Sequence, residues 1–224
     1  YNQVESVLES GEEEDIFSPE YFEKLSDVKM PATKLELLVK ILRKQIKEYG
    51  KVNRLAAKIY HEMLEKTIAE YHERRKHLSA EEAGEAQKQV SEDIIKIATE
   101  QALAILRAMN ENRESFRKMG LTFEEKAFYD ILVSMRDQYN FEYGTDKEVD
   151  GIVINDKCKN LAIKVKEIID TKSSFADWLN NQNVRDQLKL EIKIYLVKNG
   201  YPPQYSPEVF KKVMDFIVGF NHSC

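Results

Sequence analysis

The sequence predicts an all-α protein, a multi-helix bundle in which a long-helix N-terminal part packs with a smaller C-terminal helical part. Apolar residues recur at three- and four-residue steps over most of the chain from Pro31 onward, which is the spacing of one helix face. Two Ser/Thr-x-x-Glu sequences, at Ser79 and Thr122, precede such stretches, and this pattern caps helix N-termini. Only one segment alternates apolar and polar residues in the way a strand does.

The composition is that of an ordinary globular chain. Its 224 residues include 34 Lys and Arg against 39 Asp and Glu, a net charge of −5, and 42% are hydrophobic. A chain of this length buries about 70% of its extended surface on folding, so a sizeable core is possible. Two cysteines, Cys158 and Cys224, are too few for a disulfide framework, and no apolar run approaches the roughly 20 residues that span a bilayer. We therefore expect a cytoplasmic protein without a membrane partner.

Residues 1–30 differ in charge from the rest of the chain. They contain nine acidic and two basic residues, a net charge of −7, which leaves +2 for the other 194. Because the stretch around Gly11 has little apolar content, we expect an acidic linker or a first short helix. The chain begins with Tyr1 rather than Met, so we expect a piece of a longer protein.

Residues 31–119 are expected to form a bundle of long helices. Two stretches each have one apolar side, and Gly50 between them breaks or bends the helical course. A third helix is expected to start at Ser79, where Glu82 can complete a capping box. Stripes this long are more typical of core packing than of a cofactor site. The expected core residues are Leu35, Leu38, Val39, Leu42, Ile46, Tyr49, Val52, Leu55, Ile59, Met63, Ile68 and Tyr71, then Val90, Ile94, Ile97, Ala98, Ala102, Ile105, Leu106 and Met109.

Residues 120–224 are expected to be the smaller helical part. Gly120 ends one helix and Thr122 starts the next, with Glu125 placed to complete a second capping box. Residues 140–151 are expected to be a loop, and Ser206-Pro207 opens the last helix. The expected core residues are Phe128, Ile131, Leu132 and Met135, then Cys158, Leu161, Val165, Ile168 and Ile169, and finally Phe210, Val213, Met214, Ile217 and Phe220.

The segment 188–196 is ambiguous. Its apolar and polar residues alternate as in a half-buried strand, yet its residues four apart also fit one helix face that Gly200 would end. As a strand, the segment would hold Glu191 and Lys193 in the Glu-x-Lys arrangement of metal-dependent nucleases, in which the carboxylate binds Mg²⁺. A tripeptide this common occurs by chance in charged proteins, and no second strand carrying an Asp stands nearby.

The sequence contains no complete motif for a zinc protease or for a nucleotide-binding loop. His61-Glu62 begins the zinc-protease pattern His-Glu-x-x-His, but Glu65 stands where the second His is needed. No Gly-rich loop precedes the pair Lys172-Ser173, so backbone N–H groups are not arranged to cradle a nucleotide phosphate. We therefore expect no catalytic, cofactor-binding or metal site in this chain.

Basic residues cluster modestly. Each cluster could contact the phosphate backbone of a nucleic acid, or could form the solvated face of a helix in an acidic chain. The candidate DNA-contacting residues are Arg74, Arg75, Lys189, Lys193, Lys211 and Lys212.

One combination of motifs is more specific. The run Gly-Leu-x-x-Glu-Glu-x-Ala-Phe-Tyr-Asp from Gly120 to Asp130 is followed by Asp177-Trp178, Val184-Arg185 and Gly200-Tyr201-Pro202-Pro203. In order and spacing, residues 59–220 resemble the C-terminal helical region of the restriction (R) subunit of type I restriction-modification enzymes. The resemblance implies that 177–200 is helical.

The resemblance implies a division of labour. The complete R subunit of that family is an ATP-dependent type I site-specific deoxyribonuclease, whose nuclease and motor domains use ATP and Mg²⁺ and have no counterpart here. Its C-terminal region is expected to dock the motor on the methyltransferase and specificity subunits bound at the recognition sequence. This chain would then be a coupling module, without an enzymatic activity of its own. The alternative is a helical DNA-binding domain that contacts the phosphate backbone near the motor.

Aromatic residues in irregular segments suggest where a partner would bind. Trp and Tyr dominate interface energetics, so the candidate partner-binding residues are Trp178, Arg185, Tyr201, Pro202 and Pro203. The structural alternative is that Trp178 fixes a loop onto the bundle and that the Tyr-Pro-Pro turn only connects two helices.

Overall fold

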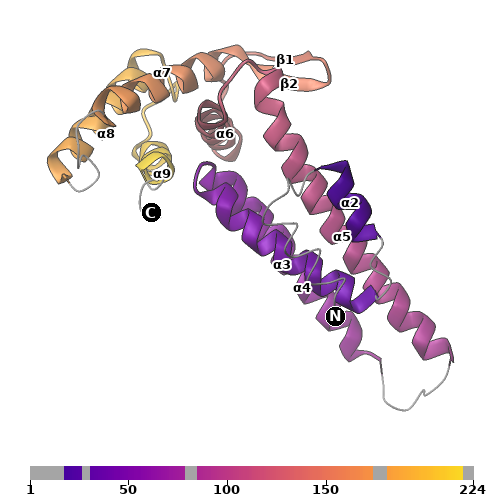
Figure 1. Cartoon of the computed structure of the whole chain (residues 1–224). Helices are drawn as coiled ribbons and strands as arrows, with labels where there is room; N and C mark the ends of the chain where they lie inside the picture. The colour runs from indigo at the N-terminus through magenta and orange to yellow at the C-terminus, as the bar shows by residue number, and fades with distance from the viewer. Residues whose placement is uncertain (1–17, 27–30, 79–84, 174–180, 219–224) are drawn as a thin grey trace. The chain divides into compact units, whose positions relative to one another are not determined.

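The computed structural model describes residues 18–26, 31–78, 85–173 and 181–218 (Figure 1). Within these ranges it contains eight helices and a single two-stranded sheet, so the predicted all-α class is confirmed. The helices are α2 (Pro19–Ser26), α3 (Pro31–Gly50), α4 (Arg54–Lys76), α5 (Glu85–Lys118), α6 (Phe123–Gln138), α7 (Asp156–Ser173), α8 (Gln182–Lys198) and α9 (Pro207–Val218), and the strands are β1 (Asp146–Val149) and β2 (Ile152–Asn155).

The chain divides into two compact units. Unit 1 comprises residues 1–48 and 58–112, and unit 2 comprises residues 49–57 and 113–224. Unit 1 therefore contains α2 and most of α3, α4 and α5, whereas unit 2 contains the corner between α3 and α4, the end of α5, and all later elements.

The core of unit 1 is mostly aliphatic and comes from all four of its helices. The expected positions on α3 are largely buried, but on α4 the buried face is that of Tyr60 and Leu64. Ile59 and Met63, which we expected in the core, are 47% and 41% exposed because they lie beside that face. Buried residues of unit 1 include Tyr21, Leu25, Leu38, Leu42, Ile46, Tyr60, Leu64, Ile94, Ala98, Ala102, Ile105, Leu106 and Met109, whereas Val90 and Ile97 are exposed. The helix start expected at Ser79 lies outside the described residues.

The core of unit 2 forms around α6. This helix packs against α7 and α9, and α8 packs against the same two helices. The buried side chains include Phe128, Ile131, Leu132, Met135, Cys158, Leu161, Val165, Leu188, Ile192, Leu196, Val209, Phe210, Val213, Met214 and Ile217. Nearly all of the predicted core positions of this part are therefore correct, although Ile168 and Ile169 are only partly buried and Phe220 lies outside the described residues.

The junction between α5 and α6 has the predicted capping. Gly120 adopts a left-handed conformation (φ 67°) just after α5. The Thr122 hydroxyl accepts a hydrogen bond from the Glu125 backbone N–H at 3.2 Å, and the Glu125 carboxylate accepts one from the Thr122 N–H at 2.8 Å. The capping box expected from the sequence is confirmed, because both reciprocal bonds are present.

Residues 140–151 are not simply a loop. Residues 146–149 and 152–155 pair as an antiparallel hairpin, and Asp150 (φ 51°) and Gly151 (φ 76°) form its two-residue turn. Asp-Gly is a typical sequence for a turn with two positive φ angles, so the sequence does contain a hairpin signal. The loop prediction is wrong here because β1 is fully exposed and lacks the apolar alternation of a half-buried strand.

The ambiguous segment 188–196 is part of α8. Its helical form agrees with the family resemblance and contradicts the strand alternative. Glu191 forms an ion pair with Lys172 at 3.0 Å, whereas Lys193 donates a hydrogen bond to the Tyr205 hydroxyl. Residues two apart on a helix point about 200° apart, so Glu191 and Lys193 do not form the arrangement of a metal-dependent nuclease. Within the described residues, no group of three potential metal ligands comes together.

Candidate interaction surfaces

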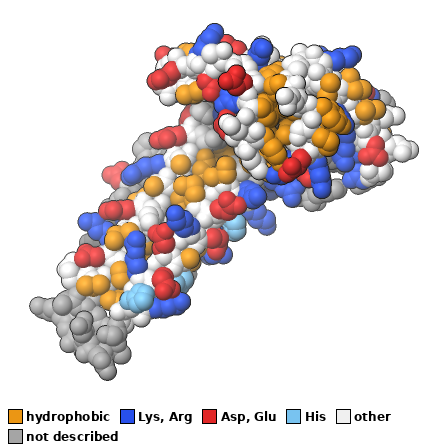
Figure 2. Space-filling model, turned by 180° about the vertical axis from the view of Figure 1, so that it is seen from behind, with side chains coloured by type: hydrophobic (Ala, Val, Ile, Leu, Met, Phe, Trp, Pro, Cys, Tyr) orange, Lys and Arg blue, Asp and Glu red, His pale blue; other side chains and the backbone are white. Residues whose placement is uncertain are grey.

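Helix α8 has a second apolar face besides the one in the core. Leu188, Ile192 and Leu196 are buried, whereas Leu190, Ile194 and Val197 are exposed by 56%, 43% and 48%. At about 100° per residue, the three exposed side chains fall within about 60° of one another, directly opposite the buried face. We call Leu190, Ile194 and Val197 the α8 face. Hydrophobic side chains reach the surface over the part of the molecule formed by α6 to α9 (Figure 2).

These two opposed faces explain the ambiguity of the sequence. A helix with apolar residues on both sides places one at every second position, and a strand gives the same alternation. The α8 face does leave a signal in the sequence, at spacings of four and three residues. A search for a single apolar helix face misses the α8 face, because it interprets the residues of the second face as the alternating pattern of a strand.

Lys189 and Lys193 of α8, and Lys211 of α9, are the candidate DNA-contacting lysines that have no carboxylate partner among the described residues. The Lys193 ammonium donates a hydrogen bond to the Tyr205 hydroxyl at 2.8 Å and lies 5.0 Å and 5.4 Å from the ring centroids of Tyr205 and Phe210. Among the described residues, Lys189 and Lys211 form no ion pair. The Tyr205 ring, 63% exposed, provides a flat surface next to this charge. The positive charges of Lys189, Lys193 and Lys211 are therefore not neutralised by a carboxylate of the described residues.

Lys212 is in a different environment. Its ammonium lies 5.0 Å from the Tyr139 ring centroid and 3.8 Å from the Glu208 carboxylate, which also accepts a hydrogen bond from the Tyr139 hydroxyl. A hydrogen bond to Tyr139 is the main reason that the pKa of Lys212 lies above its usual value. Lys212 thus has an acidic partner within the fold, unlike Lys189 and Lys211.

The Tyr-Pro-Pro turn is part of the core rather than a surface corner. Tyr201 is completely buried, its hydroxyl donates a hydrogen bond to the Leu132 carbonyl at 2.7 Å, and burial raises its pKa. The Tyr201–Pro202 peptide bond is cis and Pro202 is buried, whereas Pro203 is exposed. The expectation that Tyr201 and Pro202 face a partner is therefore corrected, because core packing takes up both side chains.

The remaining sequence-predicted residues do not converge on one site. Trp178 lies outside the described residues. Arg185 is half-buried in the first turn of α8 and donates a hydrogen bond to the Gln182 side chain at 2.6 Å. Arg74 and Arg75 are exposed at the end of α4, in unit 1, whereas the four candidate lysines belong to unit 2.

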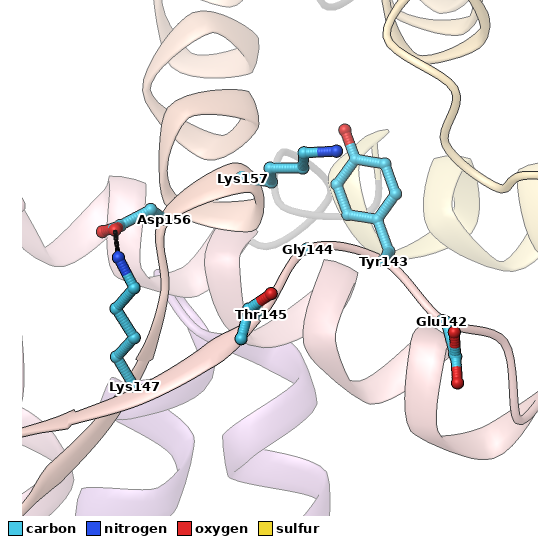
Figure 3. A pocket seen from close by; sticks show the side chains of 7 residues that line it. All are labelled: Glu142, Tyr143, Gly144, Thr145, Lys147, Asp156 and Lys157. Carbon is cyan, nitrogen blue, oxygen red and sulfur yellow. Dashed lines mark ion pairs between the residues drawn. The ribbon is translucent and has the colours of Figure 1, made fainter.

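A pocket of about 480 Å³ lies where the hairpin meets α7 (Figure 3). Lys147 and Asp156 form an ion pair at 3.7 Å on one side, and the Lys157 ammonium lies 5.5 Å from the Tyr143 ring centroid. The Glu142 carboxylate points away from the other labelled side chains (Figure 3). With two acidic and two basic side chains in its lining, the pocket has no net charge that would select an anion or a cation.

A buried polar network holds this pocket in shape. The Asn155 side chain caps α7 by accepting from the Cys158 N–H, and it donates to the Tyr143 carbonyl and the Asp146 carboxylate. Arg136 donates two hydrogen bonds to Asp146, at 2.6 Å and 3.0 Å, and this holds the pKa of the Asp146 carboxyl below its usual value. Both polar atoms of the Asn155 side chain have partners within the fold, so the network supports structure rather than chemistry.

Comparison with known proteins decides the family. Residues 4–222 match the family model described as type I restriction enzyme HindI endonuclease subunit-like, C-terminal. The chain belongs to this family. The resemblance inferred from the motifs is therefore confirmed, and the two units described above are parts of a C-terminal region of this kind of endonuclease protein.

A relative gives the same assignment. Over 196 residues the region is 26% identical to a protein of Methanocaldococcus jannaschii provisionally named type I restriction enzyme MjaIXP endonuclease subunit. The match covers 88% of this chain but only 16% of the relative. No solved structure matches the chain. Among the described helices, none is both long and apolar enough to cross a membrane.

Proposed function

We propose that this C-terminal region is the assembly module of a type I restriction endonuclease subunit. It docks the DNA translocase and nuclease of that subunit on the methyltransferase and specificity subunits through the α8 face. The complete subunit is an ATP-dependent site-specific deoxyribonuclease in the cytoplasm, and its ATP and Mg²⁺ bind in other domains. This region contributes rigid positioning rather than a reaction.

The observation that carries the proposal is the second apolar face of α8. Full burial of a Leu, Ile or Val side chain is worth about 1.5–3 kcal/mol, so half-exposed side chains gain roughly 1 kcal/mol each when a partner covers them. The three residues of the α8 face together supply about 3 kcal/mol, which corresponds to roughly 100-fold in affinity. Exposed side chains this close together on one helix are typical of helix-mediated docking, whereas single exposed apolar residues are ordinary.

A binding titration tests this function. The chain is titrated against its own methyltransferase–specificity core, with and without duplex DNA, at two salt concentrations. We expect saturable binding without DNA, weakened about tenfold or more by Leu190→Asp because a charge would then be buried in the interface. Ile59→Asp, at a helix position of similar exposure in unit 1, is the matched control and is expected to leave the affinity within about twofold. An equal loss of affinity in both variants, or no binding without DNA, would contradict the docking role.

A second candidate function is contact with the DNA backbone. It is supported by Lys189, Lys193 and Lys211, which have no carboxylate partner among the described residues, and by the exposed ring of Tyr205. Each phosphate contact adds about 0.9 to the slope of log affinity against log salt, so Lys189→Gln with Lys211→Gln is expected to reduce that slope by about 2. If the slope for duplex DNA is unchanged in the double variant, these lysines do not contact phosphate.

A further inference from the structure

Unit 1 has a groove that the docking role of α8 does not use. It lies along one side of α3 and α4 and has a volume of about 350 Å³. Its apolar lining comes from Leu35 and Val39 of α3, Ile68 and Tyr71 of α4, and Ala98 of α5. We call this depression the α3–α4 groove.

The groove exists because small side chains stand where larger ones would fill the space. Ala98 is 2% exposed, and Ala32 lines the groove from the first turn of α3. Val39 and Ile68 are only partly buried, so apolar surface remains available inside the groove. The volume is at the small end of the range for ligand pockets, which suits one or two bulky apolar side chains.

The charges along the rim are unequal. Arg75 donates a hydrogen bond to the Tyr71 hydroxyl at 3.2 Å, and its guanidinium carbon lies 5.6 Å from the centroid of that ring. Among the described residues Arg75 forms no ion pair, so most of its N–H donors are free and already oriented. Arg43, at the other end, is neutralised by Glu65 at 3.2 Å.

Glu36 and Arg75 place opposite charges on the two sides of the groove. It lies on the α3 side of the groove, whereas His72 and Arg75 lie on the α4 side. A ligand carboxylate would be repelled by Glu36 and attracted by Arg75. The guanidinium, stacked on Tyr71, is a preorganised carboxylate receptor, and such preorganisation lowers the entropic cost of binding.

We propose that the α3–α4 groove binds an amphipathic helix of a partner protein, one that inserts a bulky apolar side chain and sets a carboxylate against Arg75. The apolar lining provides affinity, and Arg75 and Glu36 on opposite sides of the groove fix the direction of the bound helix, with its carboxylate at Arg75 and away from Glu36. This interaction is independent of the α8 face, which belongs to the other unit.

Three synthetic helical peptides of equal length test the proposal by fluorescence anisotropy with the 224-residue chain. The first has Leu and Phe on one face and Glu beside them, the second has Lys in place of Glu, and the third has Ala in place of Leu and Phe. We expect the first to bind about tenfold or more tightly than the third, which lacks the bulky apolar side chains, and more tightly than the second, whose Lys would lie against Arg75. If none of the peptides binds, or if the Ala peptide binds as well as the first, the proposal is wrong.

Two variants separate groove binding from general electrostatic attraction. Arg75→Glu is expected to weaken binding of the acidic apolar peptide about tenfold and to strengthen binding of the Lys peptide. Arg74→Glu makes the same change of charge one residue away and outside the groove lining, and is expected to change affinity less than about twofold. Equal effects of the two variants would overturn the proposal, because they would show attraction to the whole basic end of α4. Both residues are exposed, so circular dichroism is expected to show unchanged folding.

Discussion

Two isoleucines of α8 offer a direct test of its two faces. Ile192 is completely buried and Ile194 is 43% exposed, although they stand two residues apart in the same helix. Ile192→Ala removes buried methyl and methylene groups and leaves a cavity, which costs about 2–5 kcal/mol. Ile194→Ala loses little burial, and the higher helix propensity of Ala offsets part of that loss, so the net change is expected to be below about 0.5 kcal/mol.

The assay is urea unfolding followed by circular dichroism, with both variants compared to the unchanged chain. At a typical m value of about 2 kcal/mol per molar urea, Ile192→Ala is expected to lower the midpoint by roughly 1–2.5 M. Ile194→Ala is expected to leave the midpoint almost unchanged while weakening binding to the methyltransferase–specificity core. Equal losses of stability would refute the reasoning, because they would mean that the α8 face is already covered within the chain.

Three further predictions concern unit 2. Gly144→Ala is expected to destabilise the chain by about 1–3 kcal/mol in urea unfolding, because φ is +67° and the new Cβ would lie 2.5 Å from the Asn155 side-chain oxygen. Tyr201→Phe is expected to cost about 0.5–1.5 kcal/mol in the same assay, because the hydrogen bond from the buried hydroxyl to the Leu132 carbonyl is lost. The lowered pKa of Asp146 stabilises the fold above the usual carboxyl pKa near 4, and this contribution disappears as the pH falls through the lowered value. In Asp146→Asn, urea midpoints measured from pH 7 down to pH 2 are therefore expected to fall less steeply on the acid side.

Much of the fold could be predicted from local sequence. The capping box at Thr122 and Glu125 depends on neighbouring residues alone, and the apolar stripe of α6 reports a single buried face. For α4 the expected stripe is correct at Leu55 but wrong at Ile59 and Met63, which are exposed. Apolar spacing gives the period of a helix, but small residues such as Ala56 and Ala57 decide which face packs, and they give a weak signal.

The candidate site was harder to predict for a different reason. Tyr201 is a candidate from the sequence because aromatic residues favour interfaces, but the same ring also fills a core and its hydroxyl finds a carbonyl 69 residues away in sequence. Burial of this kind depends on tertiary packing, which periodicity does not report. The lysines show the same limit, because Lys189 and Lys212 look alike in sequence but only Lys212 has a carboxylate nearby among the described residues.

The α8 face also bears on the life of the subunit before it assembles. An apolar helix surface without its partner favours self-association, and proteases and chaperones recognise such surfaces. Under the docking role proposed above, a subunit made in excess of its partners would thus be removed or held back until a partner covers the α8 face. Light scattering of the chain at increasing concentration, with and without Leu190→Asp, measures its tendency to self-associate through the α8 face.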